Sequence, residues 1–132
     1  IGNLSTLREL YVSCCWAVPP HIGRLRLLRH LYLHQGPFSI SLPPEIGMLE
    51  QLLTLVVNGI SGDIPEEIGD LCRLTELSLL FSSGTSLPQS LCRLRSLRAL
   101  KLSYLRVPDI PMDVLLLPEL RTANINLCCR KE

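Results

Sequence analysis

The apolar residues of this chain follow a pattern that returns every 21 to 24 residues. Within one repeat, two leucines lie three positions apart and an alternating Leu-x-Leu follows, as in Leu25, Leu28, Leu31 and Leu33. The alternation predicts a short strand with its leucines on one side, and the spacing of three predicts a helical or near-helical turn with both leucines inward. We therefore expect six short strands, centred on residues 10–12, 31–33, 55–57, 77–79, 100–102 and 123–125.

Proline marks the same point in five of the repeats, at Pro19, Pro43, Pro65, Pro88 and Pro111. The last apolar residue of the following strand always lies 14 residues after the proline, whereas 7 to 10 residues separate each strand from the next proline. A fixed period in the low twenties predicts a solenoid, in which the constant segment stacks and the variable segment is a surface loop. Because every turn runs in the same direction, the strands should form a parallel sheet, with the prolines outside its hydrogen-bond ladder.

Two segments carry a resemblance to a known family. Residues 58–69 read Asn-Gly-Ile-Ser-Gly-Asp-Ile-Pro-Glu-Glu-Ile-Gly, and residues 42–47 read Leu-Pro-Pro-Glu-Ile-Gly. Both resemble leucine-rich repeats, and the resemblance extends over essentially the whole chain. It implies an α/β fold, a right-handed leucine-rich-repeat solenoid shaped as a horseshoe arc. Its concave face would be a parallel β-sheet of about six short strands, and its convex side would be mostly irregular or short helical.

The chain opens without methionine in mid-repeat, and neither end carries an obvious polar cap, which terminal repeats of a solenoid normally need. We therefore expect residues 1–132 to be a single leucine-rich-repeat domain that is a fragment of a longer array. The repeats would start near residues 1, 22, 46, 68, 91 and 114.

Composition excludes several classes of function. Apolar residues make up 47% of the chain and the net charge is +1, which argues against a general nucleic-acid binder. No apolar run approaches the roughly 20 residues that span a bilayer, so we expect no membrane contact. The three histidines have no serine or cysteine partner in a catalytic pattern, and no phosphate-binding glycine loop is present. We expect a non-enzymatic segment without cofactor or metal.

Six cysteines raise the question of disulfides. The pairs Cys14-Cys15 and Cys128-Cys129 fall in the first and last repeats, which five steps of roughly 4.8 Å separate by about 24 Å, far beyond the ~7 Å that a disulfide can bridge. Cys72 and Cys92 lie in neighbouring repeats at different offsets, so their pairing is conceivable but unsupported. We expect reduced thiols, which favour a cytoplasmic protein.

The strand residues that do not face the core should form columns on the concave face, one residue from each strand. The first column is Tyr11, Tyr32, Val56, Ser78, Lys101 and Asn124. The second is Ser13, His34, Asn58, Leu80, Ser103 and Asn126. The third is Cys14, Gln35, Gly59, Phe81, Tyr104 and Leu127.

These columns predict a protein-recognition surface, because tyrosine is enriched among binding hot spots and nothing in this register buries the apolar pair Leu80-Phe81. Tyr11 and Tyr32 should stack side by side. The alternative is that these side chains pack against other repeats or domains of the intact protein. The predicted protein-binding residues are Tyr11, Tyr32, His34, Val56, Asn58, Ser78, Leu80, Phe81, Lys101, Ser103, Tyr104, Asn124 and Asn126.

Arginine recurs just before the strand, at Arg8, Arg29, Arg98 and Arg121, and Leu53 and Thr75 interrupt this column. Such a stripe could meet an acidic partner. The other interpretation is a solvated edge, on which the arginines pair with local glutamates such as Glu9 and Glu119.

The position that carries a regular asparagine in extracellular plant receptors is occupied here by Cys15, Gly36, Ile60, Ser82, Leu105 and Cys128. With the Leu-Pro-x-x-Ile-Gly form, this departure makes the chain resemble plant intracellular nucleotide-binding disease-resistance proteins. That resemblance implies an effector-sensing or autoinhibitory segment whose partner is a pathogen effector, a guarded host protein or the receptor's own switch domain.

Two alternatives remain open for the function of this chain. One is a scaffold of the Ras-group repeat type that binds signalling proteins. The other is a fragment of the ectodomain of a plant receptor-like kinase.

Overall fold

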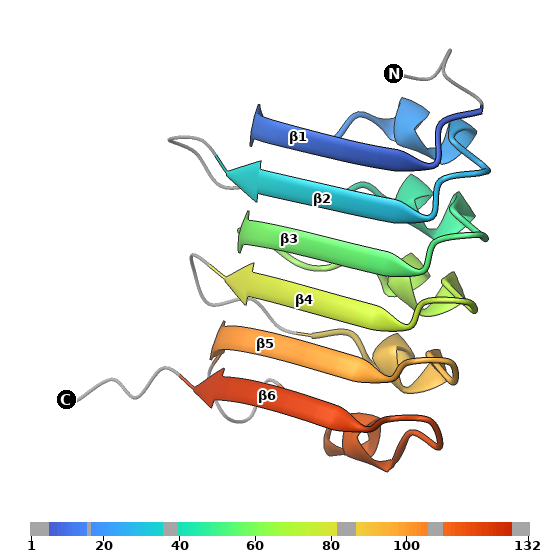
Figure 1. Ribbon diagram of the computed structural model, residues 1–132. Coiled ribbons are helices and arrows are strands. Elements are labelled where there is room, and N and C mark those ends of the chain that lie inside the picture. The colour runs from blue at the N-terminus through green and yellow to red at the C-terminus, as the bar shows by residue number, and fades with distance from the viewer. Residues whose placement is uncertain (1–5, 16, 36–39, 82–86, 106–109, 128–132) are drawn as a thin grey trace, which may run out of the picture.

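The computed structural model describes residues 6–15, 17–35, 40–81, 87–105 and 110–127. Six strands lie side by side in one sheet, and each is parallel to the next (Figure 1). They are β1 (Glu9–Cys15), β2 (His30–Gln35), β3 (Thr54–Ile60), β4 (Glu76–Phe81), β5 (Ala99–Leu105) and β6 (Thr122–Leu127). All six predicted strands are therefore confirmed, and their order in space is their order in the sequence.

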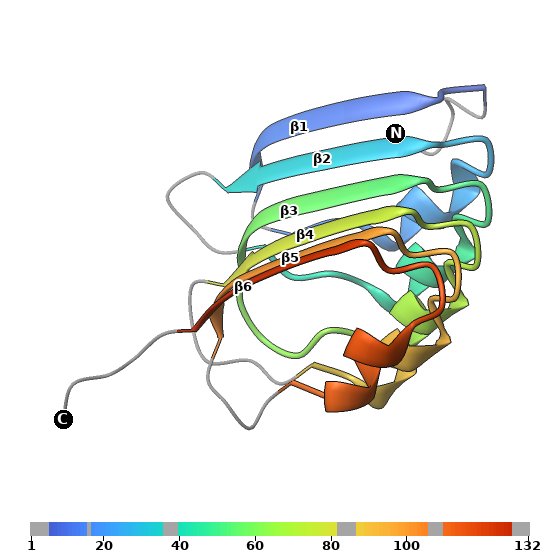
Figure 2. The same cartoon turned by 60° about the horizontal axis from the view of Figure 1, so that its bottom comes forward.

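The return path of each turn carries a short 3₁₀ helix. These helices are η1 (Pro20–Arg24), η2 (Pro44–Met48), η3 (Glu66–Asp70), η4 (Gln89–Arg93) and η5 (Met112–Leu116). Each begins directly after one of the five recurring prolines, whose extended backbone (φ −69° and ψ 152° at Pro19) directs the chain into the helix. Figure 2 shows the sheet on one side of the winding and the helices on the other.

Hydrogen bonds between residues three apart explain why the apolar residues of the return path recur with that spacing. The amide of Ile22 donates to the carbonyl of Pro19, that of Leu25 to Ile22, and that of Leu28 to Leu25, each at 3.0 Å. Residues three apart in such turns point the same way, so Ile22, Leu25 and Leu28 all face the sheet. These three side chains are at most 1% exposed, and Leu31 from β2 meets them in the core.

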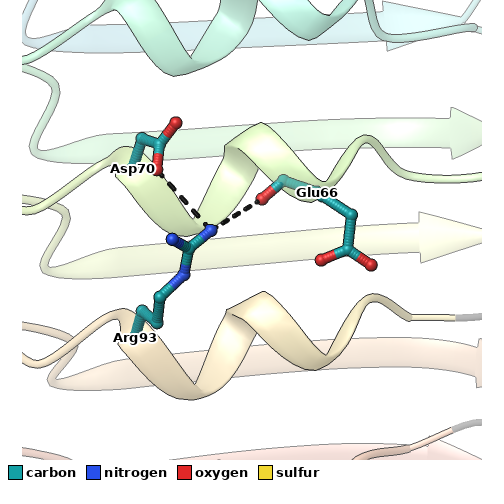
Figure 3. A network of polar contacts seen from close by, with 3 residues as sticks. All are labelled: Glu66, Asp70 and Arg93. Carbon is teal, nitrogen blue, oxygen red and sulfur yellow. Dashed lines mark hydrogen bonds and ion pairs between the residues drawn. The ribbon is translucent and has the colours of Figure 1, made fainter.

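Glycine allows neighbouring helices to pack closely. A Cβ on Gly47 of η2 would lie 2.6 Å from the carbonyl oxygen of Glu67 in η3, and a Cβ on Gly69 would lie 2.5 Å from that of Ser90 in η4. Real Cβ contacts are not this short, so only glycine fits. Arg93 also reaches from η4 to η3, where its guanidinium lies 3.4 Å from the carbonyl oxygen of Glu66 and 3.6 Å from the carboxylate of Asp70 (Figure 3).

Bulges change the register at the carboxyl ends of the strands. β1, β3 and β5 each contain an irregularity, between residues 13 and 15, 58 and 60, and 103 and 105. The predicted third column is therefore wrong. Its members pair one residue later on the bulged strands: Gln35 with Cys15, Phe81 with Ile60, and Leu127 with Leu105.

The bulge in β3 is accommodated by Gly59, whose φ of 94° lies in the left-handed region. The following residue, Ile60, is 1% exposed and belongs to the core. Ile60 stands at one of the positions where extracellular plant receptors carry asparagine, so an apolar side chain fills the interior there.

Candidate protein-binding face

In the described ranges no helix covers the outer face of the sheet, which we call the open face (Figure 2). The first two predicted columns lie on it in the predicted register. Tyr11 pairs with Tyr32, Tyr32 with Val56, and the column continues through Ser78, Lys101 and Asn124. The second column runs from Ser13 through His34, Asn58, Leu80 and Ser103 to Asn126. These residues alternate with core leucines along each strand, which turns them away from the interior.

An aromatic stack occupies the β1 end of the open face. The rings of Tyr11 and Tyr32 are stacked with centroids 4.4 Å apart and an angle of 5° between their planes, as predicted. Tyr11 is 65% exposed and Tyr32 is half-buried beneath it. Burial, and next the neighbouring Tyr11, raise the pKa of the Tyr32 hydroxyl. The stack therefore presents a flat apolar platform with both phenols protonated at neutral pH.

A polar pair lies beside the aromatic stack in the second column. The side-chain amide of Asn58 donates a hydrogen bond of 2.9 Å to Nδ1 of His34. An acceptor at Nδ1 places the ring proton of neutral His34 on Nε2. The open face thus offers a ring N–H donor next to the tyrosines.

A hollow of about 290 Å³ lies on the same face over β3 to β6. Its lining includes Val56, Ser78, Lys101 and Asn124 of the first column. It also includes residues that the sequence prediction missed, namely Glu76, Ala99 and Thr122, together with the backbone-facing Leu77 and Leu100. Glu76, Ala99 and Thr122 stand two residues before the first column on their strands, so extending the same alternation by one step would have found them.

Exposure differs among the predicted binding residues. His34, Lys101, Asn124 and Asn126 are exposed, as is Tyr11, whereas Val56, Asn58, Ser78 and Leu80 are half-buried. Ser103 keeps its place in the second column but is only 4% exposed, so its side chain offers a partner little surface. The side chains of Phe81 and Tyr104 lie outside the described part of the structure.

The described thiols are not cross-linked. Cys72 is exposed and Cys92 is half-buried, and both are free. Burial raises the pKa of the Cys92 thiol, and the negative charge of Asp113 adds to this effect. The side chains of Cys14, Cys15, Cys128 and Cys129 are outside the described residues. Among the residues that are described, no three histidine, cysteine or acidic side chains gather in a way that could hold a metal ion.

Six parallel strands, prolines at a fixed offset and a leucine core define a leucine-rich-repeat solenoid with an uncovered sheet. The chain belongs to the leucine-rich repeat family, since the family described as "Leucine-rich repeat region" matches residues 1–127. Leucine-rich repeats are generally non-catalytic protein-interaction modules. No helix in the described segments has the length and hydropathy required to cross a bilayer.

One curated relative is the TMV resistance protein N of Nicotiana glutinosa, which is 30% identical over 125 residues. The match covers 86% of this chain but only 11% of the relative, so the chain corresponds to a small part of that protein.

Two solved structures share the fold, each with a TM-score of 0.80 over 96% of this chain. The first is a leucine-rich-repeat protein of Leptospira interrogans, 28% identical, of which 39% is covered. The second is the ectodomain of the membrane receptor kinase GASSHO1/SCHENGEN3 from Arabidopsis thaliana in complex with CASPARIAN STRIP INTEGRITY FACTOR 2, 32% identical, of which 16% is covered.

Proposed function

We propose that this chain is the effector-sensing or autoinhibitory repeat segment of a plant disease-resistance receptor that acts in the cytoplasm. The observation that carries the proposal is the 30% identity to TMV resistance protein N, which runs through 86% of the chain. The apolar Ile60 at a position where extracellular plant receptors carry asparagine supports the same assignment.

The contact surface in this proposal is the open face. The Tyr11–Tyr32 stack would serve as an aromatic anchor, and the hollow beside Lys101 would receive a polar or acidic side chain of the partner. The predicted surface residues that line or flank these two features are His34, Val56, Asn58, Ser78, Leu80, Asn124 and Asn126. The partner would be a pathogen effector, a guarded host protein or the receptor's own switch domain.

Such a segment controls a receptor only by differential affinity. If the open face binds the switch domain more tightly in its inactive state, the repeats hold the receptor off, and an effector that competes for the same face releases it. No catalytic group in the segment is required for this action.

A second candidate is an ectodomain fragment of a plant receptor-like kinase. It is favoured by the similarity to the Arabidopsis receptor-kinase ectodomain, which has the higher identity of the two solved structures described above. The two candidates predict different neighbours for this chain in the complete protein.

The full-length coding sequence distinguishes the two candidates. The disease-resistance assignment predicts a nucleotide-binding module upstream of residue 1. A transmembrane segment and a kinase downstream, with no nucleotide-binding module upstream, would contradict it and support the receptor-kinase candidate. Neither arrangement would leave the Ras-group scaffold as the remaining interpretation.

A further inference from the structure

The amino ends of the strands form a rigid edge of the sheet, on the right in Figure 1. The carbonyl oxygen of Arg8 accepts hydrogen bonds from the amides of Arg29 and His30, at 2.8 and 3.0 Å. The same double contact recurs at each step, and its accepting residues are Arg8, Arg29, Leu53, Thr75 and Arg98. A regular backbone ladder therefore fixes the positions of the arginine column.

A groove opens where that column is interrupted. At Leu53 and Thr75 a shorter side chain replaces arginine, and the space left beside them belongs to a groove of about 610 Å³. The turns of the neighbouring repeats line the rest of it. The lining residues are Leu53, Arg73, Thr75, Arg95, Ser96, Arg98, Pro118 and Glu119. We call this site the rim groove.

Positive charge dominates the rim groove, since three arginines face a single carboxylate, Glu119. Arg73 is held in place by a 2.7 Å hydrogen bond from its Nη1 to Oε1 of Gln51. The expected pairing of the arginine column with Glu9 or Glu119 is not found, because the ion pair present in the described ranges joins Arg93 to Asp70 on the helical side. The guanidinium groups of Arg95 and Arg98 therefore carry no carboxylate partner in the described structure.

The hydroxyl groups in the rim groove are already engaged as donors. Thr75 Oγ1 donates to the carbonyl oxygen of Leu53 at 3.0 Å, and Ser96 Oγ donates to that of Cys72 at 2.9 Å. The donors that the groove offers to a ligand are thus the guanidinium groups. Guanidinium forms its best contacts with carboxylates, through two parallel hydrogen bonds.

We propose that the rim groove is a second binding site, separate from the open face, and that it takes an acidic peptide segment. Arg95 and Arg98 would pair with carboxylates of the peptide, while Leu53 and Pro118 would contact the aliphatic parts of its side chains. A peptide fits better than a nucleic acid, because the net charge of +1 provides no extended basic surface to follow a phosphate backbone.

The test measures binding of a fluorescein-labelled peptide of alternating Glu and Gly by fluorescence anisotropy. A Gln-Gly peptide of equal length is the neutral probe. The chain should bind the Glu-Gly peptide more tightly than the neutral one, and the affinity should fall as salt rises from about 0.05 to 0.3 M, since exposed charges are screened. Equal binding of the two peptides, or none, would overturn the proposal.

Paired variants locate the binding site. Arg95→Gln with Arg98→Gln should weaken binding of the Glu-Gly peptide about tenfold, because two exposed ion pairs are lost. Arg24→Gln with Arg93→Gln removes the same charge from the helical side and should change the affinity less than twofold. Equal losses in the two double variants would show general attraction and refute a groove.

A third variant separates the rim groove from the open face. Leu80→Ala alters the open face and should leave the Glu-Gly affinity unchanged. Loss of peptide binding in Leu80→Ala would place the peptide on the open face and overturn the second site. The rim-groove result is independent of the full-length coding sequence, so failure of one proposal is distinguishable from failure of the other.

Discussion

At the scale of the residue, one position of the repeat controls how closely two turns approach. Gly23, Gly47 and Gly69 occupy it in three repeats, and each faces the next helix at a distance that excludes a Cβ. The fourth repeat has Cys92 there, and η4 and η5 accordingly pack less closely than the preceding helix pairs. The Cys92 side chain fills the added space, half-buried and near Asp113.

The environment of Cys92 predicts slow modification of its thiol. Its raised pKa reduces the thiolate fraction at pH 7.5, and half-burial limits access, so iodoacetamide should alkylate Cys92 severalfold more slowly than the exposed Cys72. Raising the pH should increase the rate at Cys92, and Asp113→Asn should also increase it by removing a negative charge. Peptide-level mass spectrometry distinguishes the cysteines, and faster alkylation of Cys92 than of Cys72 at pH 7.5 would contradict this account.

At the scale of the element, the 3₁₀ helices stabilise the solenoid by stacking on one another. Gly47→Ala should lower the free energy of unfolding by about 1 to 3 kcal/mol, because the new methyl group would meet the carbonyl oxygen of Glu67 at 2.6 Å. Without that contact, alanine would be expected to stabilise a helical segment. The sign of the change therefore reports the close approach.

Glu66→Ala is the matched control for the glycine substitution. Glu66 lies in the adjacent helix η3, and its exposed carboxylate points away from Arg93 (Figure 3). Its replacement should change stability by less than about 0.5 kcal/mol in urea denaturation. A Gly47→Ala variant that is as stable as the parent chain would show that η2 and η3 do not pack as described.

The strands could be predicted from the sequence because the 14 residues after each proline never vary, so period and alternation agree in every repeat. The helices were located less well. The spacing of three predicted a turn at Leu25 and Leu28, whereas the 3₁₀ helix itself covers Pro20–Arg24 and the leucines follow it in an open turn with the same hydrogen-bond spacing.

The bulges could not be predicted, and they changed the candidate site. They fall at residues 13–15, 58–60 and 103–105, within the segment whose length varies from repeat to repeat. An added residue there leaves the proline spacing unchanged, so no periodic signal reveals it. Gly59 was a local hint at one bulge, but the bulges in β1 and β5 contain no glycine.

At the scale of the whole molecule, one winding creates two binding surfaces and a single core. The core is continuous, since leucines of every turn pack against the turns before and after it. The open face and the rim groove follow from the same register, which sends alternate strand residues outward and places the residue before each strand at the edge. An error in the register would therefore remove the predicted function along with the predicted core.

Adjacent leucines in β4 test that register most directly. Leu79 is 1% exposed in the core, and Leu80 is half-buried on the open face. Urea denaturation of Leu79→Ala and Leu80→Ala compares two identical chemical changes at neighbouring positions. We predict a loss of about 3 kcal/mol for Leu79→Ala and about 1 kcal/mol or less for Leu80→Ala. Equal losses, or a larger loss for Leu80→Ala, would contradict the assignment of the open face.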